Sequence, residues 1–401
     1  MLSLDVAYRR LLARAHLTDA ERVPLVDAVG RVLVEPKVIA AVDVPPFANS
    51  AMDGFALRAA DAPGSLRLAG EVTAGAAELP TVEAGTAVRI MTGAPIPPGA
   101  DTVVPLEDAT ERDELVTIPD PVVSGRHIRA AAHDTRAGEE ICIPGALTAA
   151  KIGVLASLGI GDVEVRRRPV VALLSTGNEL VGPGEPLGPG QIHDSNGAAL
   201  SAAVIEAGGI PLLLPRLRDE AWPIESALMD AARAADLVVT SGGVSVGRHD
   251  YVRAVLERNG SLDFWRIAVQ PGKPLAVGAL GGATVIGLPG NPVSALVTFE
   301  LFVRPMIRNM LDLSGDGRLH VLATPTERMT KDVSRRAFLR VGVWREDGEI
   351  HARPAGGQQS SQLRPLADGN ALLVVPEGAD AAETHLSYEA IVFEPIWLTG
   401  R

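Results

Sequence analysis

The chain contains a single cysteine, Cys142, among its 401 residues. One cysteine excludes an intramolecular disulfide and any metal site built from several cysteines, and it is typical of a reducing compartment. The first residues lack a basic segment followed by an apolar run, so we expect no secretion signal. We therefore expect a cytoplasmic protein.

Basic residues are also in short supply. There are 37 Lys and Arg against 49 Asp and Glu, which gives a formal net charge of −12 at pH 7. This balance argues against nucleic acid and against anionic membrane surfaces as partners, because both attract positive charge. A single basic pocket in an acidic chain remains possible, so small anionic ligands stay open.

Aromatic residues make up only 3% of the chain, whereas glycine and proline number 41 and 30. The cores must therefore rest on Val, Leu, Ile and Ala, and turns must be frequent. The uncharged stretch 274–299 is long enough to cross a bilayer. Its glycines and prolines instead predict two short strands and the start of a helix.

The sequence changes rhythm near residue 169. Before it, the spacing of apolar residues predicts helices over 4–15, 24–29 and 148–158, a strand over 31–34, and short proline-broken strands through 45–134. After it, apolar runs alternate with helical segments, which predicts a mostly parallel sheet covered on both faces. The strands are expected at 170–174, 211–214, 237–240, 275–277 and 285–288, and the helices at 197–207, 221–234, 250–257 and from 291. Beyond the linker-like segment 313–317, alternation with period two predicts a small β domain.

Three glycine-bearing turns follow predicted strands of this α/β region. Ligands of open parallel sheets bind at that edge, where glycines let backbone N–H groups approach a phosphate. Taken singly, each is more simply a tight turn, but three on one edge favour an anion pocket. The turns comprise 175–179 with Ser175 and Gly177, 241–247 with Ser241, Gly242, Gly243 and Ser245, and 288–292 with Pro289, Gly290 and Asn291, a plausible helix N-cap.

Carboxylates accompany these turns. Glu179, Asp194, Asp219 and Asp250 lie in or beside them, and such acids next to a phosphate cradle would suit Mg²⁺. The alternative for each is a solvated loop carboxylate or a helix cap. Lys273, in a Pro-Gly-Lys-Pro turn preceded by Arg266, is a reasonable contact for an oxyanion.

Two other motif patterns bear on the function. Residues 243–247 match the G-x-S-x-G elbow of serine hydrolases, with Ser245 as the nucleophile, but two glycines separate the motif from its strand. The chain contains neither G-x-x-x-x-G-K-[ST] nor G-x-G-x-x-G, so the common nucleotide-binding folds lose support.

One long motif resembles a known family. Residues 45–56, read as P-P-F-A-N-S-A-M-D-G-F-A, resemble the signature of the molybdopterin molybdenumtransferases, bacterial molybdenum insertases to which the gephyrin E-domain is related. Further matching motifs follow in family order, at 90–95, 175–180, 241–251, 271–274, 288–293, 335–340 and 375–378. The resemblance covers essentially the whole chain.

The resemblance implies a reaction and a set of residues. Adenylylated molybdopterin and molybdate would give molybdenum cofactor and AMP with Mg²⁺ as cofactor. The catalytic acids carried over by position are Asp53, Asp134, Glu179, Asp219 and Asp250, of which the last three would also hold the metal. Thr92 and Arg129 would bind substrate, and Arg266, Gln270 and Lys273 would lie near molybdate.

The resemblance also implies an architecture: a homodimer of four-domain subunits. Domain I would comprise 1–44 and 135–168 (mixed α/β), domain II the β-rich insertion 45–134, domain III the α/β pterin-nucleotide domain 169–313, and domain IV the β domain 314–401. Transient contacts with molybdopterin adenylyltransferase and with molybdoenzyme maturation factors are expected. A scaffold that holds cofactor intermediates without turnover remains the alternative from the binding class.

The chain departs from the family pattern at three positions. Gln270 stands where many members have lysine, and Arg266 where some do, so the oxyanion site would carry less charge. Glutamine can still donate an N–H group to an oxyanion. Phe55 replaces the usual tyrosine.

Overall fold

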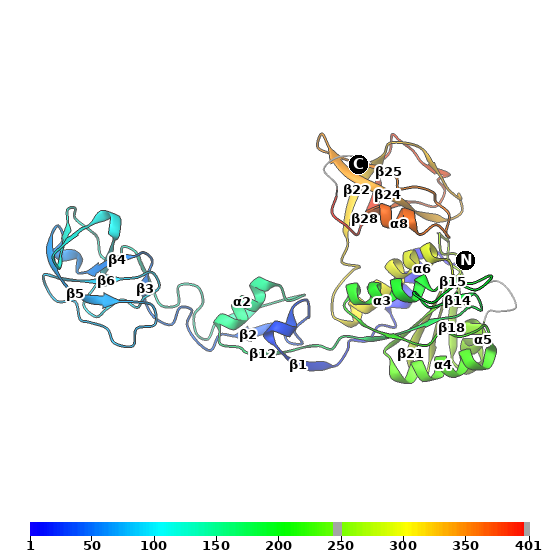
Figure 1. Ribbon diagram of the computed structural model, residues 1–401, viewed down its shortest axis with the longest axis horizontal. Helices are drawn as coiled ribbons and strands as arrows, with labels where there is room; N and C mark the ends of the chain where they lie inside the picture. The colour runs from blue at the N-terminus through cyan, green and yellow to red at the C-terminus, as the bar shows by residue number, and fades with distance from the viewer. Residues whose placement is uncertain (244–250, 397–401) are drawn as a thin grey trace. The chain divides into compact units, whose positions relative to one another are not determined.

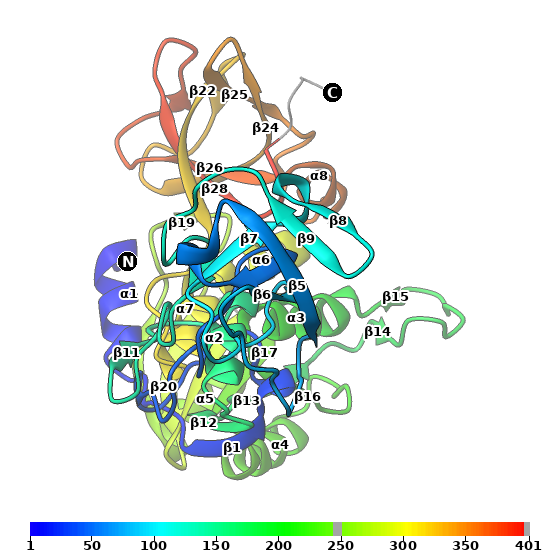
Figure 2. The same ribbon diagram turned by 90° about the vertical axis from the view of Figure 1, so that its left-hand side faces the viewer.

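The computed structural model describes residues 1–243 and 251–396, which form two compact units. The first unit comprises residues 1–21, 30–32 and the chain from Val165 onward, and the second comprises 22–29 and 33–164. Figures 1 and 2 show the chain from the blue N-terminal helix to the red C-terminal strands.

A six-stranded sheet forms the centre of the first unit, with the order β16-β13-β17-β21-β20-β18. The first four strands run parallel, and β20 and β18 extend the sheet antiparallel at one edge. β17 and β21 are buried along their whole length, as parallel strands covered on both faces should be. The bounds are β13 Val170–Ser175, β16 Ile210–Leu213, β17 Leu237–Ser241, β18 Ser261–Trp265, β20 Ala276–Leu280 and β21 Ala283–Leu288.

Helices cover both faces of this sheet (Figure 1). Side chains alternate along each strand, so Val171 and Leu173 enter one core while Ala172 and Leu174 enter the other. On the first face lie α1 Leu4–Leu12, α3 Ser195–Ala207, α6 Pro292–Thr298, the π-helical turn η4 Phe299–Val303 and α7 Arg304–Met310. On the second face lie α4 Ala221–Ala234 and α5 Tyr251–Asn259.

The C-terminal strands close into a small barrel. β24 pairs with both β25 and β26, and the ring is completed through β22 and β28. The short strand β19 (Val269–Gln270) comes from the α/β region and pairs with β24, which joins the barrel to the sheet domain. The other bounds are β22 Leu319–Pro325, β23 Met329–Thr330, β24 Arg336–Glu346, β25 Glu349–Pro354, α8 Arg364–Asp368, β26 Ala371–Val375, β27 Ala381–Ala382 and β28 Tyr388–Val392.

An arm leaves the sheet after β13. Its two short strands, β14 Leu180–Val181 and β15 Ile192–His193, are paired in parallel, and the glycine- and proline-rich residues 182–191 connect them (Figure 2).

The second unit is built around another six-stranded sheet, with the order β7-β4-β6-β5-β9-β8 and apolar clusters on both faces. β3 pairs with β10 and β2 with β11, and Thr148 caps helix α2. The bounds are η1 Leu25–Ala28, β2 Lys37–Ile39, β3 Asn49–Ser50, β4 Gly54–Leu57, η2 Ala59–Asp61, β5 Gly64–Val72, β6 Thr86–Ile90, β7 Thr102–Pro105, η3 Leu106–Asp108, β8 Thr110–Arg112, β9 Leu115–Ile118, β10 Ile128–Arg129, β11 Glu140–Cys142 and α2 Ala149–Ser157. Strands β1 (Ala20–Pro24) and β12 (Asp162–Arg166) form a further two-stranded pair.

The predicted fold class is confirmed: a multidomain α/β chain with a mostly parallel central sheet and a small C-terminal β domain. The strand predicted over 31–34 is wrong, because that segment makes only single bridges and the nearby strand is β2. The stretch 274–299 contains β20, β21 and α6, as predicted. Among the described residues no helix is long and apolar enough to cross a membrane. The four-domain division stays a prediction.

Candidate active site

Three of the predicted turns meet at the carboxyl edge of the parallel sheet. The strand register places Ser175 opposite Ser241, and Ser241 opposite Leu288. The backbone N–H of Thr176 donates to Ser241 O at 3.1 Å, and that of Gly242 donates to Leu288 O at 3.2 Å. The parallel register therefore places the three turns side by side at one edge of the sheet.

Gly242 lets two of these turns approach closely. Its φ of +91° is unfavourable for residues with a side chain, and a Cβ atom there would lie 2.7 Å from Thr176 O. The backbone of Gly242 thus packs directly against the backbone of Thr176.

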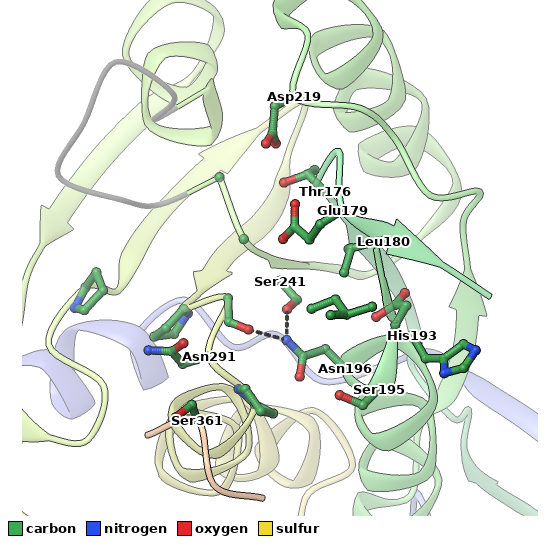
Figure 3. Close-up of a pocket in the computed structure, with 18 residues that line it drawn as sticks. Thr176, Glu179, Leu180, His193, Ser195, Asn196, Asp219, Ser241, Asn291 and Ser361 are labelled. Carbon is green, nitrogen blue, oxygen red and sulfur yellow. Dashed lines mark hydrogen bonds between the residues drawn. The ribbon is translucent and has the colours of Figure 1, made fainter. Parts of the chain in front are cut away.

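A cavity of about 610 Å³ opens above this edge (Figure 3). It contains groups from all three turns, from the start of α3 and from the C-terminal barrel. The lining residues are Thr176, Glu179, Leu180, Ile192, His193, Asp194, Ser195, Asn196, Asp219, Ser241, Gly242, Gly243, Pro274, Pro289, Gly290, Asn291, Pro292 and Ser361.

Two of the predicted metal ligands lie in this cavity. In Figure 3 the carboxylates of Glu179 and Asp219 lie on the same side as Thr176, and the Asp219 backbone N–H donates to Asn178 Oδ1 at 3.3 Å. The third predicted ligand, Asp250, lies outside the described residues. Within the described ranges, no group of three or more His, Cys, Asp or Glu side chains could hold a metal ion.

Asp194 has a structural role that the sequence left open. It precedes α3 and its Oδ1 accepts a hydrogen bond from Gly197 N at 2.8 Å, so it is the helix N-cap. Of the roles that the sequence left open for Asp194, the structure shows the helix cap.

The remaining turn residues differ in their access to the cavity. Pro289, Gly290, Gly243 and Asn291 line it, whereas Ser175 is buried at the end of β13 and Gly177 lies beneath the Glu179 carboxylate. Asn291 occupies the N-cap position of α6, but its amide donates to Ser360 Oγ at 2.9 Å and makes no cap bond. Ser245, and with it the serine-hydrolase alternative, lies outside the described residues.

The three residues predicted near molybdate follow β18. Arg266 has a φ of +91°, Lys273 is exposed, and its neighbour Pro274 lines the cavity. Gln270 Oε1 accepts a hydrogen bond from Asp332 N at 3.0 Å, so the amide oxygen is used by the C-terminal domain.

Sequence reasoning missed the contribution of the C-terminal barrel. Arg340 is 1% exposed, and burial lowers its pKa to about 10. Its Nη2 donates to Gly357 O at 2.9 Å and to Gln359 O at 3.2 Å, which holds the loop that carries Ser360 and Ser361. The available sequence signal was the motif at 335–340, which resembles the family but does not indicate a site.

Sequence reasoning also missed Asn196 at the start of α3. Its Nδ2 donates to Ser241 Oγ at 2.6 Å and to Gly290 O at 2.8 Å, and so joins two of the turns (Figure 3). The polar run 194–197 before a predicted helix was the available signal, but which turns it would contact depends on tertiary structure.

The second unit holds the other predicted residues. The backbone N–H and hydroxyl of Thr92 donate to Asp53 Oδ1 at 2.6 and 2.7 Å, and these bonds hold the pKa of Asp53 below its usual value. Arg129 lies opposite Asn49 in the β10–β3 pair, and Asp134 N donates to Val44 O at 2.9 Å.

The packing of the motif at residues 45–56 explains why it contains Gly54 and Phe55. A Cβ atom on Gly54 would lie 2.0 Å from Val104 O, so the neighbouring strand excludes any side chain. Phe55 is 1% exposed in the core, and the guanidinium of Arg89 lies 5.5 Å from its ring centre. Phe55 is therefore a packing residue.

Known proteins match most of the chain. Family models described as "MoeA N-terminal region (domain I and II)", "Probable molybdopterin binding domain" and "MoeA C-terminal region (domain IV)" match residues 2–159, 172–309 and 322–384. The chain is 39% identical over 369 residues to molybdopterin molybdenumtransferase 2 of Mycobacterium tuberculosis, covering 88% of this chain and 90% of that protein. It is 39% identical over 387 residues to the Haemophilus influenzae molybdopterin molybdenumtransferase, covering 94% and 95%.

A solved structure agrees. The molybdopterin biosynthesis MoeA protein of Pyrococcus horikoshii superposes with a TM-score of 0.82 at 31% identity, covering 98% of this chain and 100% of that one. These matches identify the chain as a transferase of molybdenum cofactor biosynthesis. The chain belongs to the molybdopterin molybdenumtransferase family, also called MoeA.

Proposed function

We propose that the protein transfers molybdenum from molybdate to adenylylated molybdopterin and releases AMP. The observation that carries this proposal is the cavity in which three turns of the parallel sheet meet beside Glu179 and Asp219. A cavity at this edge suits a pterin nucleotide, because backbone N–H groups and helix starts there favour phosphate.

The proposed reaction balances without an oxidant or reductant. The two thiols of the pterin dithiolene replace one oxygen of molybdate, which leaves as water with their two protons. One water molecule then cleaves the phosphoanhydride, giving AMP and the phosphate of the pterin. The soft sulfur ligands come from the substrate, so the protein needs no cysteine at the site.

The carboxylates present fit a magnesium ion. Mg²⁺ is usually held by one or two carboxylates together with substrate phosphates and water. Glu179 and Asp219 provide two such groups in the cavity, and the family resemblance adds Asp250. The bound ion would supply positive charge to the phosphoanhydride as it is cleaved.

We assign substrate binding to two sets of residues. The turns supply Ser175, Gly177, Ser241, Gly242, Gly243, Ser245, Pro289, Gly290 and Asn291 for the nucleotide part. Lys273 and Arg266 would attract molybdate, and Gln270 would present its amide N–H groups because its oxygen is already bonded. In the second unit, Asp53, Thr92, Arg129 and Asp134 are proposed to serve the same reaction.

The assembly and its setting rest on the family resemblance. We propose a cytoplasmic homodimer that receives its substrate through transient contact with molybdopterin adenylyltransferase and passes the product to molybdoenzyme maturation factors.

The test is AMP release by purified protein mixed with adenylylated molybdopterin, molybdate and Mg²⁺. AMP and active cofactor should form together, and chelation of Mg²⁺ should stop both. Tight pterin binding without turnover would instead favour the scaffold alternative and would overturn the proposal.

A further inference from the structure

The Asn196 side chain makes two hydrogen bonds, and together they determine whether the Ser241 hydroxyl donates or accepts its next hydrogen bond. Its Nδ2 donates at 2.8 Å to the carbonyl oxygen of Gly290, and at 2.6 Å to the hydroxyl oxygen of Ser241 (Figure 3). Asn196 lies on α3, whereas Gly290 follows β21 and Ser241 is the last residue of β17. The side chain therefore joins three elements at the wall of the cavity.

The Gly290 carbonyl fixes the orientation of the amide. A carbonyl oxygen can only accept, so the amide must place its NH₂ group there and not its oxygen. An amide nitrogen has two hydrogens, and the second is directed to Ser241 Oγ. Ser241 is therefore an acceptor in this pair.

An accepting hydroxyl still has its own hydrogen to donate. Ser241 is 4% exposed and lines the cavity, and in the part of the chain that the structure describes its hydroxyl has no acceptor. A hydroxyl that has accepted one strong bond and lacks an acceptor of its own is suited to an electron-rich oxygen in the cavity.

We propose that Asn196 is a positioning residue that commits the Ser241 hydroxyl to donate to an anionic oxygen of the substrate. The inference rests on the proposed function for the identity of that substrate. The chemistry recognised is a tetrahedral oxyanion, which is supplied by the phosphate of the adenylyl group or by molybdate.

Three variants test this directionality. Asn196→Asp replaces the donating NH₂ with a carboxylate that can only accept, so the Ser241 hydrogen turns to the new carboxylate and is lost to the substrate. Asn196→Ala removes the partner without capturing the hydroxyl. Ser241→Ala removes the donor itself, and Ser201→Ala is the control, because its hydroxyl bonds only Gly197 O within α3 at 2.7 Å.

We expect Asn196→Asp and Ser241→Ala to raise the KM for adenylylated molybdopterin about ten- to hundredfold, as for loss of a hydrogen bond to a charged group. Asn196→Ala should have a smaller effect, and Ser201→Ala none. The double variant Asn196→Asp/Ser241→Ala should be no worse than the poorer single variant. Additive losses, or equal losses in Asn196→Ala and Asn196→Asp, would overturn the proposal.

Calorimetry separates the two sources of the oxyanion. If the phosphate is recognised, Ser241→Ala weakens binding of AMP alone and leaves binding of molybdate alone unchanged; the reverse identifies molybdate. Unchanged binding of both probes in folded protein refutes the inference. A wild-type protein that releases no AMP from the full substrate mixture would contradict the proposed function instead, so the two failures are distinguishable.

Discussion

The cavity of the first unit and the Asp53–Thr92 pair of the second unit are assembled in different ways. Asn196 and Gly290 are 94 positions apart and meet only because a parallel sheet brings its turns to one edge. Asp53 and Thr92 are 39 positions apart, lie next to the ends of the antiparallel strands β4 and β6, and have exposed side chains. The first site depends on the register of a parallel sheet, whereas the second depends on the register of the antiparallel β4–β6 pair, and substitutions should separate the two.

The largest effect is expected for the cavity carboxylates. Glu179→Gln and Asp219→Asn should each lower kcat at least about a hundredfold, because they remove charge where the phosphoanhydride is proposed to bind. Glu185→Gln is the matched control. The Glu185 carboxylate lies in the connection between β14 and β15 and pairs with Arg216 at 2.8 Å, but it does not line the cavity. Steady-state AMP release measures all three, and full activity in either cavity variant would remove that residue from the reaction.

Comparing substitutions at two separate glycines tests how much the close packing of backbone at Gly242 matters. Gly242 and Gly184 both have left-handed φ values, but a Cβ atom at Gly184 would meet open space. Gly184→Ala should lower the free energy of unfolding by about 1–2 kcal/mol. Gly242→Ala should cost more and should also reduce turnover, because its Cβ would press on Thr176. Urea unfolding and AMP release test this; equal losses in stability would show that the contact is unimportant.

His320, on strand β22 of the barrel, should make the stability of the first unit depend on pH. His320 Nδ1 lies 2.6 Å from Glu389 Oε1 and its Nε2 lies 2.9 Å from Asp316 Oδ2. Burial opposes the charged form, but the two carboxylates outweigh it and raise the pKa of His320. Its contribution to stability is therefore complete below the unfolded pKa and is lost as pH rises through the folded pKa.

His320→Asn should accordingly destabilise the protein more at pH 6 than at pH 9, by a modest amount because the ring is partly exposed. Urea unfolding at the two pH values is the measurement. A difference that grows with pH would contradict the assigned sign.

The smallest effect, and the opposite sign, is expected in the second unit. The pKa of Asp53 is lowered by Thr92, so its contribution is present above the unfolded pKa and is lost as pH falls through the folded pKa. Thr92→Val should raise the pKa of Asp53 toward its ordinary value in an NMR titration. Thr117→Val, which breaks only a bond to Ser65 Oγ in the same unit, should leave it in place.

Much of the framework was readable from residue patterns. Helical spacing predicted α4 over 221–234 at its observed bounds, and the apolar run 371–375 within the period-two region coincides with β26. The strand predicted over 31–34 is wrong because a run of four residues is too short to show a clear alternation of apolar and polar side chains. In the structure this segment forms only isolated β-bridges. Likewise the sequence left Asp194 open between a magnesium carboxylate, a loop carboxylate and a helix cap, and only its bond to Gly197 N shows the cap.

The sequence by itself determined most of the element types, the family and the turns that carry glycine. These depend on local side-chain spacing and turn chemistry, which a short window of residues contains. Only the tertiary structure decided that Asn196 bonds Ser241 and Gly290, that Gln270 uses its oxygen on Asp332, and that Arg340 holds a loop beside the cavity. Such partners lie on different elements, and strand register and domain packing bring them together.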